Sequence, residues 1–443
     1  MKEADIIIIG GGAAGLMAAC GAGDQFAKDN QVSHKIVVLE KMPRPARKMM
    51  ITGKGRCNLT NLREWNEFQE HVHPKANFLK SAFYNMSSQG MMDFLENHGL
   101  ELVVERGERV FPMSHLASDV IDTMVRVAQE AGADILCNKT VKEITKEPEE
   151  DNFIIRCNDG SEFKGPKVII CTGGLSYPRT GSTGDGYAWA DHFGVRMTPR
   201  FPSLTAIVPK SYKQDETKGE IKGHIPRERA MSEIGQALCG IQLKNVGLQL
   251  IVDGDIVADE FGDLDFTDGG LEGPIGFKIS RKCVNSIING ARVAVRIDLK
   301  PAVELERLQQ RIRSSWDDLC KDKRLSAQSY SQRFRVLLSQ VMPSSLIPAF
   351  VKFFPNLDHK TLAKALKCWP LDIAGFVGYE RCVITAGGVA QNEVVSKSME
   401  CKKISGLYFA GEILDLDADT GGYNLQTAFS TGYLAGQHAA KSL

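Results

Sequence analysis

A glycine-rich segment near the start of the chain has the spacing of a dinucleotide-binding turn. Residues 10–15 have the sequence Gly-Gly-Gly-Ala-Ala-Gly, they follow an apolar run at 5–9, and Glu40 ends the next apolar run. In such a turn the first glycine permits the bend, the second lets the backbone approach a pyrophosphate, and the third allows close packing of helix on strand. Glu40 would accept hydrogen bonds from the adenosine ribose, and an acid at this position disfavours a 2′-phosphate. The pattern predicts a dinucleotide site.

Two later glycine motifs favour FAD over NAD. Gly411-Glu412 follows the apolar run 407–410 and is similar to the second flavin-binding element, in which an acid meets the ribityl or phosphate region. Gly422 opens a helix whose N-terminal dipole could face the pyrimidine edge of a flavin, where reduction places negative charge. We therefore expect FAD as the cofactor.

Three side chains near further glycine turns are candidates for the chemistry. The loop 53–58 carries two cations and could wrap the phosphate or isoalloxazine region, with Cys57 as a candidate redox thiol, although buried cysteine is usually inert. The turn 172–174 ends an apolar run, and just beyond it Tyr177 and Arg179 could reach a substrate carbonyl or carboxylate. An exposed turn at 53–58 and a packed turn at 172–179 are the structural alternatives.

Other chemistries find little support. His71 and His73 lack the cysteine or carboxylate spacing of a zinc site, so no metal is expected. No GxSxG, HExxH or GxxxxGK[ST] motif is present, which argues against hydrolases and P-loop enzymes. The 54 Lys and Arg balance 54 Asp and Glu, so no global basic field favours nucleic acid. The eleven cysteines form no CxxC pair, which indicates reduced thiols. No apolar segment is expected to span a membrane. We therefore expect a cytoplasmic protein that acts on a small-molecule substrate.

The elements that must position these residues are those of an α/β fold. Apolar runs at 5–9, 35–40, 134–136, 153–156 and 168–171 predict strands, and 13–22 and 118–130 predict helices. From about residue 195 short alternating segments predict a β-rich insert, and the glycine-free stretch 302–368 has helical periodicity. The α/β pattern returns near 382 and ends in a helix at 423–440. We expect a discontinuous Rossmann-type domain at 1–195 and 380–443, a β-rich insert at 196–301 and a helical subdomain at 302–379.

Taken together, the motifs resemble the BaiN-like (YhiN-type) flavoproteins, also described as the aminoacetone-oxidase family of FAD-binding enzymes. The resemblance covers nearly the whole chain, and its most specific parts are residues 55–61 and 406–426. It implies a glutathione-reductase-like FAD domain interrupted by a β-barrel-like insert and a small helical part. The cofactor ligands expected from motif and resemblance together are Gly10, Gly12, Ala13, Ala14, Gly15, Glu40, Lys41, Lys48, Gly55, Arg56, Cys57, Asn58, Val141, Thr172, Gly173, Gly174, Gly411, Glu412, Gly422, Tyr423, Asn424, Leu425 and Gln426.

The resemblance implies several activities and no single substrate. The leading hypothesis is a reductase that passes hydride from transiently bound NAD(P)H through the flavin to an unsaturated or carbonyl-bearing small molecule, since no second GxGxxG offers a nicotinamide site. A flavin oxidase of small amines, a redox-sensing flavoprotein and a tRNA-modifying flavoenzyme remain alternatives. Asp268 and Glu272 stand where the family usually carries histidine and serine, so the substrate of one member does not transfer safely.

Overall fold

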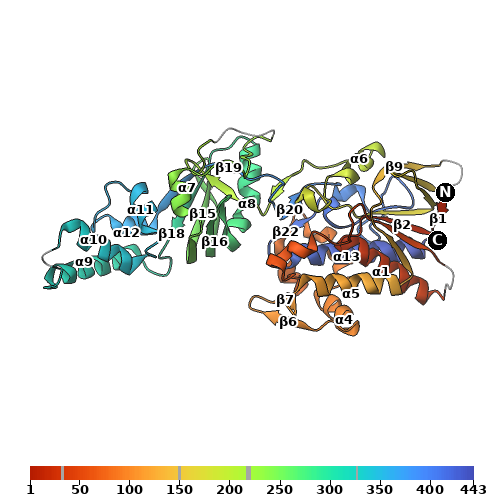
Figure 1. The fold of residues 1–443 in the computed structure, drawn as a ribbon, viewed down its shortest axis with the longest axis horizontal. Helices are drawn as coiled ribbons and strands as arrows, with labels where there is room; N and C mark the ends of the chain where they lie inside the picture. Colours follow the sequence, from red (N-terminus) through yellow and green to blue (C-terminus); the bar gives the residue numbers. More distant parts are fainter. Residues whose placement is uncertain (31–33, 148–150, 216–220, 326–327) are drawn as a thin grey trace. The chain divides into compact units, whose positions relative to one another are not determined.

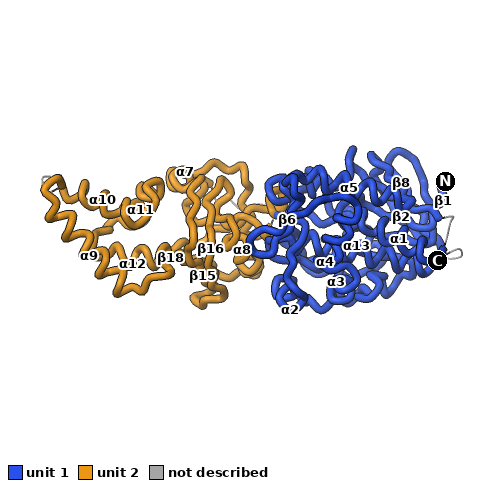
Figure 2. Tube along the Cα trace, turned by 90° about the horizontal axis from the view of Figure 1, so that it is seen from below, with its two compact units in different colours: residues 1–201, 383–443 blue, residues 202–382 orange. Residues whose placement is uncertain are grey.

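The computed structural model describes residues 1–443 except 31–33, 148–150, 216–220 and 326–327. The chain forms two compact units, coloured separately in Figure 2. The first unit contains residues 1–201 and 383–443, and the second contains residues 202–382. Both ends of the chain therefore build one unit. The finer three-part division expected from the sequence stays a prediction.

A parallel sheet of five strands forms the centre of the first unit. Its order is β21 (Leu407–Phe409), β12 (Lys167–Ile170), β2 (Ile6–Ile9), β3 (Ile36–Leu39) and β8 (Ala133–Leu136). Ile9 pairs with Ile170 on one side and with Leu39 on the other, so these strands end at the same edge. Every residue of β2 and β3 is buried, which explains why these strands are continuous apolar runs without alternation.

Three helices pack beside this sheet. The helix α1 (Ala13–Lys28) contacts both α13 (Tyr423–Lys441) and α5 (Ala117–Glu130) (Figure 1). The approach of α1 to α13 depends on glycine, because a Cβ at Gly436 would lie 1.9 Å from the Ala18 carbonyl oxygen. The first and last parts of the chain are therefore held together by backbone contact that larger residues would prevent.

Smaller sheets and helices complete the first unit. One sheet has the strand order β1 (Lys2–Glu3), β11 (Glu162–Gly165), β10 (Phe153–Cys157) and β9 (Val141–Lys146). A second sheet has the order β4 (Thr60–Asn61), β7 (Arg109–Pro112) and β6 (Leu102–Glu105). In a third, β22 (Asp417–Ala418) pairs with β5 (Val72–His73). The shorter helices are α2 (Trp65–Phe68), α3 (Lys80–Asn85), α4 (Ser88–Asn97) and α6 (Asp185–His192).

The second unit contains a closed antiparallel barrel. Its strands, in order around the barrel, are β14 (Ile207–Pro209), β17 (Gly270–Glu272), β16 (Asp255–Thr267), β15 (Gln242–Val252), β18 (Val293–Asp298) and β19 (Trp369–Phe376). The helix α8 (Gly273–Ile288) contacts the barrel strands β15 and β16, and α7 (Glu233–Leu238) belongs to the same unit. The prediction of a Rossmann-type domain with a β-barrel-like insert and a helical part is thus confirmed.

Four further helices follow β18 and share one apolar core with the barrel. They are α9 (Leu305–Lys321), α10 (Tyr330–Val341), α11 (Ile347–Phe353) and α12 (Leu362–Lys367). Leu308, Ile312 and Leu319 of α9 are buried at helical spacing, so this helix turns its apolar side inward. Within the described part of the chain, no helix combines the length and apolar character needed to cross a lipid bilayer.

Candidate FAD site

A pocket lies in the first unit at the carboxyl ends of the parallel strands, where open α/β sheets bind ligands. Ile9 of β2 and Leu39 of β3 line it, as does Cys171 directly after β12. The residues of the sequence-predicted set that line this pocket are Gly10, Gly12, Ala13, Ala14, Glu40, Lys41, Lys48, Val141, Thr172, Gly173, Gly411, Glu412, Asn424 and Leu425. The topology therefore brings together residues from both ends of the chain.

The glycines of the first turn have separate physical roles. Gly10 has φ +103°, and a Cβ there would lie 2.5 Å from the Cys171 carbonyl oxygen. A Cβ at Gly15 would lie 1.8 Å from the carbonyl oxygen of Gly10, so this glycine permits helix α1 to pack on the turn. Gly12 differs from both, because a Cβ would meet nothing within 4 Å. Its φ of −82° suits any residue, so nothing within the described protein requires glycine there.

Glu40 holds the turn in place from the end of β3. Its Oε2 accepts the Gly11 N–H at 2.8 Å and its Oε1 accepts the Met42 N–H at 2.7 Å. Burial raises the pKa of Glu40, and the two backbone N–H groups oppose that effect. Since a carboxylate oxygen can accept two hydrogen bonds, both oxygens keep capacity for ribose hydroxyls.

A second acidic group lies on the pocket wall formed by the late part of the chain. Lys48 Nζ approaches Glu412 Oε2 at 2.6 Å and also donates to the Ser176 hydroxyl. The other oxygen of Glu412 accepts the Thr385 N–H at 2.8 Å and the Ser176 hydroxyl. The Glu412 carboxylate is therefore fixed by groups from three distant segments.

One lining residue carries an unsatisfied polar atom. The Oγ1 of Thr172 is buried and has no hydrogen-bond partner within the described residues. A buried hydroxyl without a partner costs free energy, so its position in the pocket wall suits a polar ligand. Together with the open space at Gly12 and the uncapped start of α1, the residues present fit the phosphates and ribityl chain of FAD.

The start of α13 is tied to neighbouring loops. Asn424 Nδ2 donates to the Ala418 carbonyl at 2.7 Å, and its Oδ1 accepts the Ala418 N–H at 2.8 Å. The side-chain oxygen of Asn58 accepts the Gly422 N–H at 3.2 Å. Gln426 is fully buried and donates to the Met86 carbonyl at 2.8 Å, which is a structural contact. These bonds orient the N-terminal turn of α13 toward the pocket, which Leu425 also lines.

Several predicted residues lie outside the set that lines the pocket. They are Gly15, Gly55, Arg56, Cys57, Asn58, Gly174, Gly422, Tyr423 and Gln426 among the expected cofactor ligands, and Tyr177 and Arg179 among the expected catalytic residues. Tyr177 has φ +51° and Arg179 is exposed. Their functional assignment stays a prediction.

The loop 53–58 places its two most chemically distinctive side chains in different environments. The guanidinium of Arg56 lies 4.4 Å from the Phe111 ring centroid, pairs with Glu105 and donates to His115 Nδ1 at 2.8 Å. Cys57 is fully buried, and burial raises its pKa to about 11, partly opposed by a hydrogen bond from Thr52. The Cys57 thiol is therefore protonated near neutral pH, which is unfavourable for a nucleophile.

The pocket and its surroundings also contain residues that sequence reasoning missed. Arg47, Lys139 and Trp189 line the pocket without any motif that would single them out. Near the start of α13, Asp419 contacts His71 Nδ1 at 2.9 Å and His73 Nε2 at 3.4 Å.

Arg63 completes the cluster around Asp419. Arg63 donates to His71 Nε2 at 2.8 Å, and arginine cannot accept a hydrogen bond. The His71 ring therefore turns Nε2 to Arg63 and Nδ1 to Asp419. Nothing in the sequence relates residue 71 to residue 419, so only folding reveals the pair.

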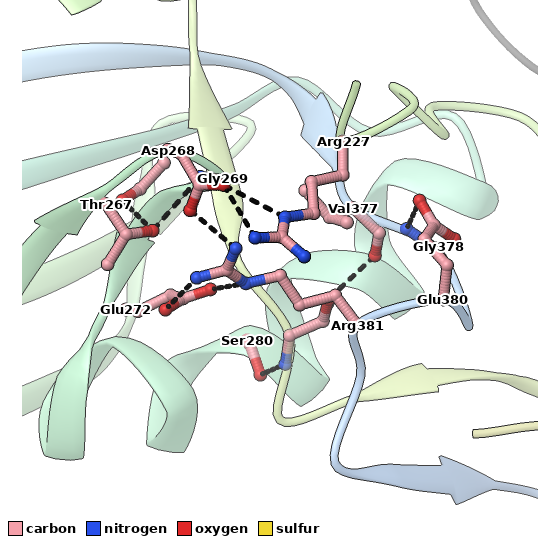
Figure 3. A network of polar contacts seen from close by, with 12 residues as sticks. Arg227, Thr267, Asp268, Gly269, Glu272, Ser280, Val377, Gly378, Glu380 and Arg381 are labelled. Atoms are coloured by element: carbon pink, nitrogen blue, oxygen red, sulfur yellow. Dashed lines mark hydrogen bonds and ion pairs between the residues drawn. The ribbon is translucent and has the colours of Figure 1, made fainter. Parts of the chain in front are cut away.

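A separate polar network lies in the second unit around Asp268 and Glu272 (Figure 3). Arg381 contacts Glu272 through two bonds of 2.6 and 3.0 Å and Asp268 through one of 2.5 Å. Arg227 binds the other oxygen of Asp268 at 2.9 Å. Lys213, itself buried, donates to the carbonyls of Arg227, Arg229 and Asp268. The network ties four segments of the second unit together.

The fold, the pocket and the family of the chain together identify a Rossmann-type FAD-dependent oxidoreductase. Residues 4–438 match the family described as HI0933-like protein Rossmann domain, and the chain belongs to this family. The resemblance drawn from the sequence motifs is thereby confirmed, and the family supports FAD as the cofactor.

Named relatives match along their whole length. The chain is 28% identical to a 3-dehydro-bile acid delta(4,6)-reductase of Clostridium scindens over 98% of both chains. It is 29% identical to a ribosomal RNA dihydrouridine synthase of Escherichia coli over 100% of both. Among solved structures, it is similar to an open flavocytochrome c3 fumarate reductase (16% identity, 99% of this chain and 78% of that chain, TM-score 0.48).

Proposed function

We propose that this protein uses FAD to saturate a carbon–carbon double bond conjugated to a carbonyl, with NAD(P)H as the hydride source. The observation that carries the proposal is the shared chemistry in the names of two full-length relatives. A delta(4,6)-reductase of a 3-dehydro bile acid and a dihydrouridine synthase both add two hydrogens across such a bond. The electron-poor carbon of such a substrate suits a hydride donor.

When bound, FAD accepts hydride from a nicotinamide and delivers it to carbon. The residues of the pocket would hold and orient it. The open backbone at Gly12 would receive the pyrophosphate, Glu40 would accept hydrogen bonds from the ribose, and Glu412, fixed by Lys48, would contact the ribityl region. The N-terminal turn of α13 would stabilise negative charge on the pyrimidine edge.

The reaction also requires a proton at the carbon next to the carbonyl. Tyr177 and Arg179 remain our candidates for proton donation and substrate orientation, since both follow the turn after β12. Cys57 is a weaker candidate, because burial raises the pKa of its thiol to about 11, which makes it a poor acid, and the residue lies outside the pocket lining. The chain has one dinucleotide-binding turn, which FAD would occupy. We therefore expect the nicotinamide nucleotide to bind only transiently.

The test is anaerobic turnover with NADPH and with NADH. One substrate is a steroid 4,6-dien-3-one and the other is a uridine-rich RNA, and products are analysed by mass spectrometry for a gain of two hydrogens. Reduction of either substrate supports the proposal. If neither is reduced and the protein instead oxidises small amines with formation of hydrogen peroxide, the proposal fails in favour of a flavin oxidase.

A further inference from the structure

The helical part of the second unit differs sharply in charge from the rest of the chain. Residues 302–368 contain twelve Lys and Arg but six Asp and Glu. Because the whole chain balances 54 against 54, all other residues together carry an excess of six acids. The zero net charge of the protein therefore conceals a basic segment built from α9, α10, α11 and α12 (Figure 1).

Most of these cations face solvent and lack acidic partners. Lys352 pairs with Glu233 at 3.2 Å and Lys367 pairs with Asp298 at 2.6 Å. Eight others are exposed and form no ion pair with any carboxylate that the structure describes, namely Arg307, Arg311, Arg313, Lys321, Arg324, Arg335, Lys360 and Lys364. Arg307 and Arg311 are four residues apart on one helix, where like charges repel. A bound polyanion would relieve that repulsion.

An apolar groove adjoins this basic surface. Phe353, Phe354 and Leu357 line it together with Lys364 and Lys367, and both phenylalanine rings are partly exposed. Aromatic rings beside cations form the platform on which unpaired bases stack while the backbone follows the charge. The groove therefore suits a single-stranded nucleic acid better than a purely apolar ligand.

We propose that the helices α9, α10, α11 and α12 carry a binding surface for single-stranded RNA, with phosphates on the exposed cations and bases in the groove at Phe353 and Phe354. The identity of the reacting base rests on the proposed function: uracil carries a double bond conjugated to its C4 carbonyl, and it must leave the base stack to reach a buried flavin.

A membrane surface fits the same helices less well. An interfacial helix needs an apolar face directed at the lipid. In α9 that face is occupied, because Leu308, Ile312 and Leu319 are buried in the core shared with the barrel. The outer side of α9 is polar and includes the exposed Arg307, Arg311 and Arg313, which suits phosphates in solution.

The test compares two charge-reversal variants of the FAD-loaded full chain. Lys360→Glu with Lys364→Glu changes the proposed surface, and Lys28→Glu with Lys142→Glu makes the same charge change at exposed positions of the first unit. Binding of a labelled uridine-rich RNA is measured by fluorescence anisotropy over a range of salt concentrations. We expect the first variant to bind at least tenfold more weakly, with a salt slope reduced by roughly 1.4 for two lost phosphate contacts. The control variant should bind like the parent.

Equal losses in both variants, or none in either, would overturn the proposal. So would parent protein that binds anionic phospholipid vesicles or polyglutamate as tightly as RNA at the same salt. Reduction of the flavin by NADPH and of the steroid dienone is measured in parallel. If RNA binding follows the prediction while no double bond is reduced, the surface stands and the proposed reaction fails.

Discussion

Gly12 offers the sharpest test of the cofactor site, because its side-chain position is empty within the protein. A Cβ there meets nothing within 4 Å, and φ is −82°. Replacement by valine should therefore leave the fold intact, at a cost of less than about 1 kcal/mol for a changed helix N-cap. The isopropyl group would instead occupy the space through which the pyrophosphate approaches the start of α1.

The expected loss of FAD affinity follows from blocking the approach of the pyrophosphate to the backbone at the start of α1. Keeping the pyrophosphate away from the backbone forfeits at least one charge-assisted hydrogen bond, worth about 1.5–3 kcal/mol. This corresponds to roughly tenfold to hundredfold weaker binding, with steric exclusion adding to it. The assay is the ratio of flavin to protein absorbance after gel filtration, with circular dichroism and thermal unfolding of the apoprotein alongside.

The matched control is Gly15→Ala in the same turn. Its Cβ would lie 1.8 Å from the Gly10 carbonyl oxygen, so the backbone must move, and overpacking of this kind costs about 1–3 kcal/mol or more. We expect Gly15→Ala to lower the melting temperature of the apoprotein and Gly12→Val to leave it nearly unchanged. Full FAD occupancy in Gly12→Val, or an unfolded Gly12→Val apoprotein, would refute the assignment.

Three further predictions follow from titration and burial. Because burial raises the pKa of Cys57 to about 11, iodoacetamide should alkylate Cys57 at least about a hundredfold more slowly at pH 8 than the exposed Cys320. Peptide mass spectrometry follows both rates, and comparable rates would contradict the burial of Cys57. Burial acts to raise the pKa of Asp419, yet hydrogen bonds from two histidines outweigh it and lower the pKa to about 2, below the roughly 3.9 of an unfolded chain. Its stabilisation is present above about pH 4 and is lost as pH falls toward 2, so Asp419→Asn should lower the melting temperature at pH 7 and converge with the parent at the acid end. A constant gap would argue against the hydrogen bonds from the two histidines. Arg381→Met leaves the buried Glu272 without its partner and should lower the free energy of unfolding by about 3–5 kcal/mol, while the FAD content stays unchanged. Thermal unfolding and flavin absorbance measure the two quantities. Loss of FAD would place this network in the cofactor site.

The parallel sheet and its glycine turn were predictable because local sequence specifies them. Strands buried on both faces appear as continuous apolar runs, as in β2 and β3, and a strand followed by Gly-Gly-Gly-Ala-Ala-Gly has few other structural solutions. The beginning of α1 and the acid at the end of β3 follow from the same pattern.

The long-range contacts of the pocket and of the network in the second unit were not predictable from local sequence. Lys48 and Glu412 meet across 364 positions of chain, and Arg381 meets Glu272 across 109. Pairing at such separation depends on how helices and strands pack, and neither partner carries a local signal for the other. Lys139, which lies just before β9, also lines the pocket, and no local motif identifies it.

Net charge alone does not describe a surface on which the charges are unevenly distributed. The balance of 54 basic and 54 acidic residues led to the expectation of no nucleic-acid partner. That balance averages a basic helical segment with an acidic remainder, so the interpretation depends on which residues share a surface.

The central claim is a flavin that is reduced by a nicotinamide and reoxidised by a conjugated double bond. The most direct measurement is the visible spectrum of the FAD-loaded protein in an anaerobic stopped-flow instrument, first with NADPH or NADH and then with the dienone or the uridine-rich RNA. Rapid bleaching by the nicotinamide, followed by return of the oxidised spectrum with substrate in the absence of oxygen, is the predicted result. A flavin that no nicotinamide bleaches, or one that regains its colour only when oxygen is admitted and then yields hydrogen peroxide, would contradict the account.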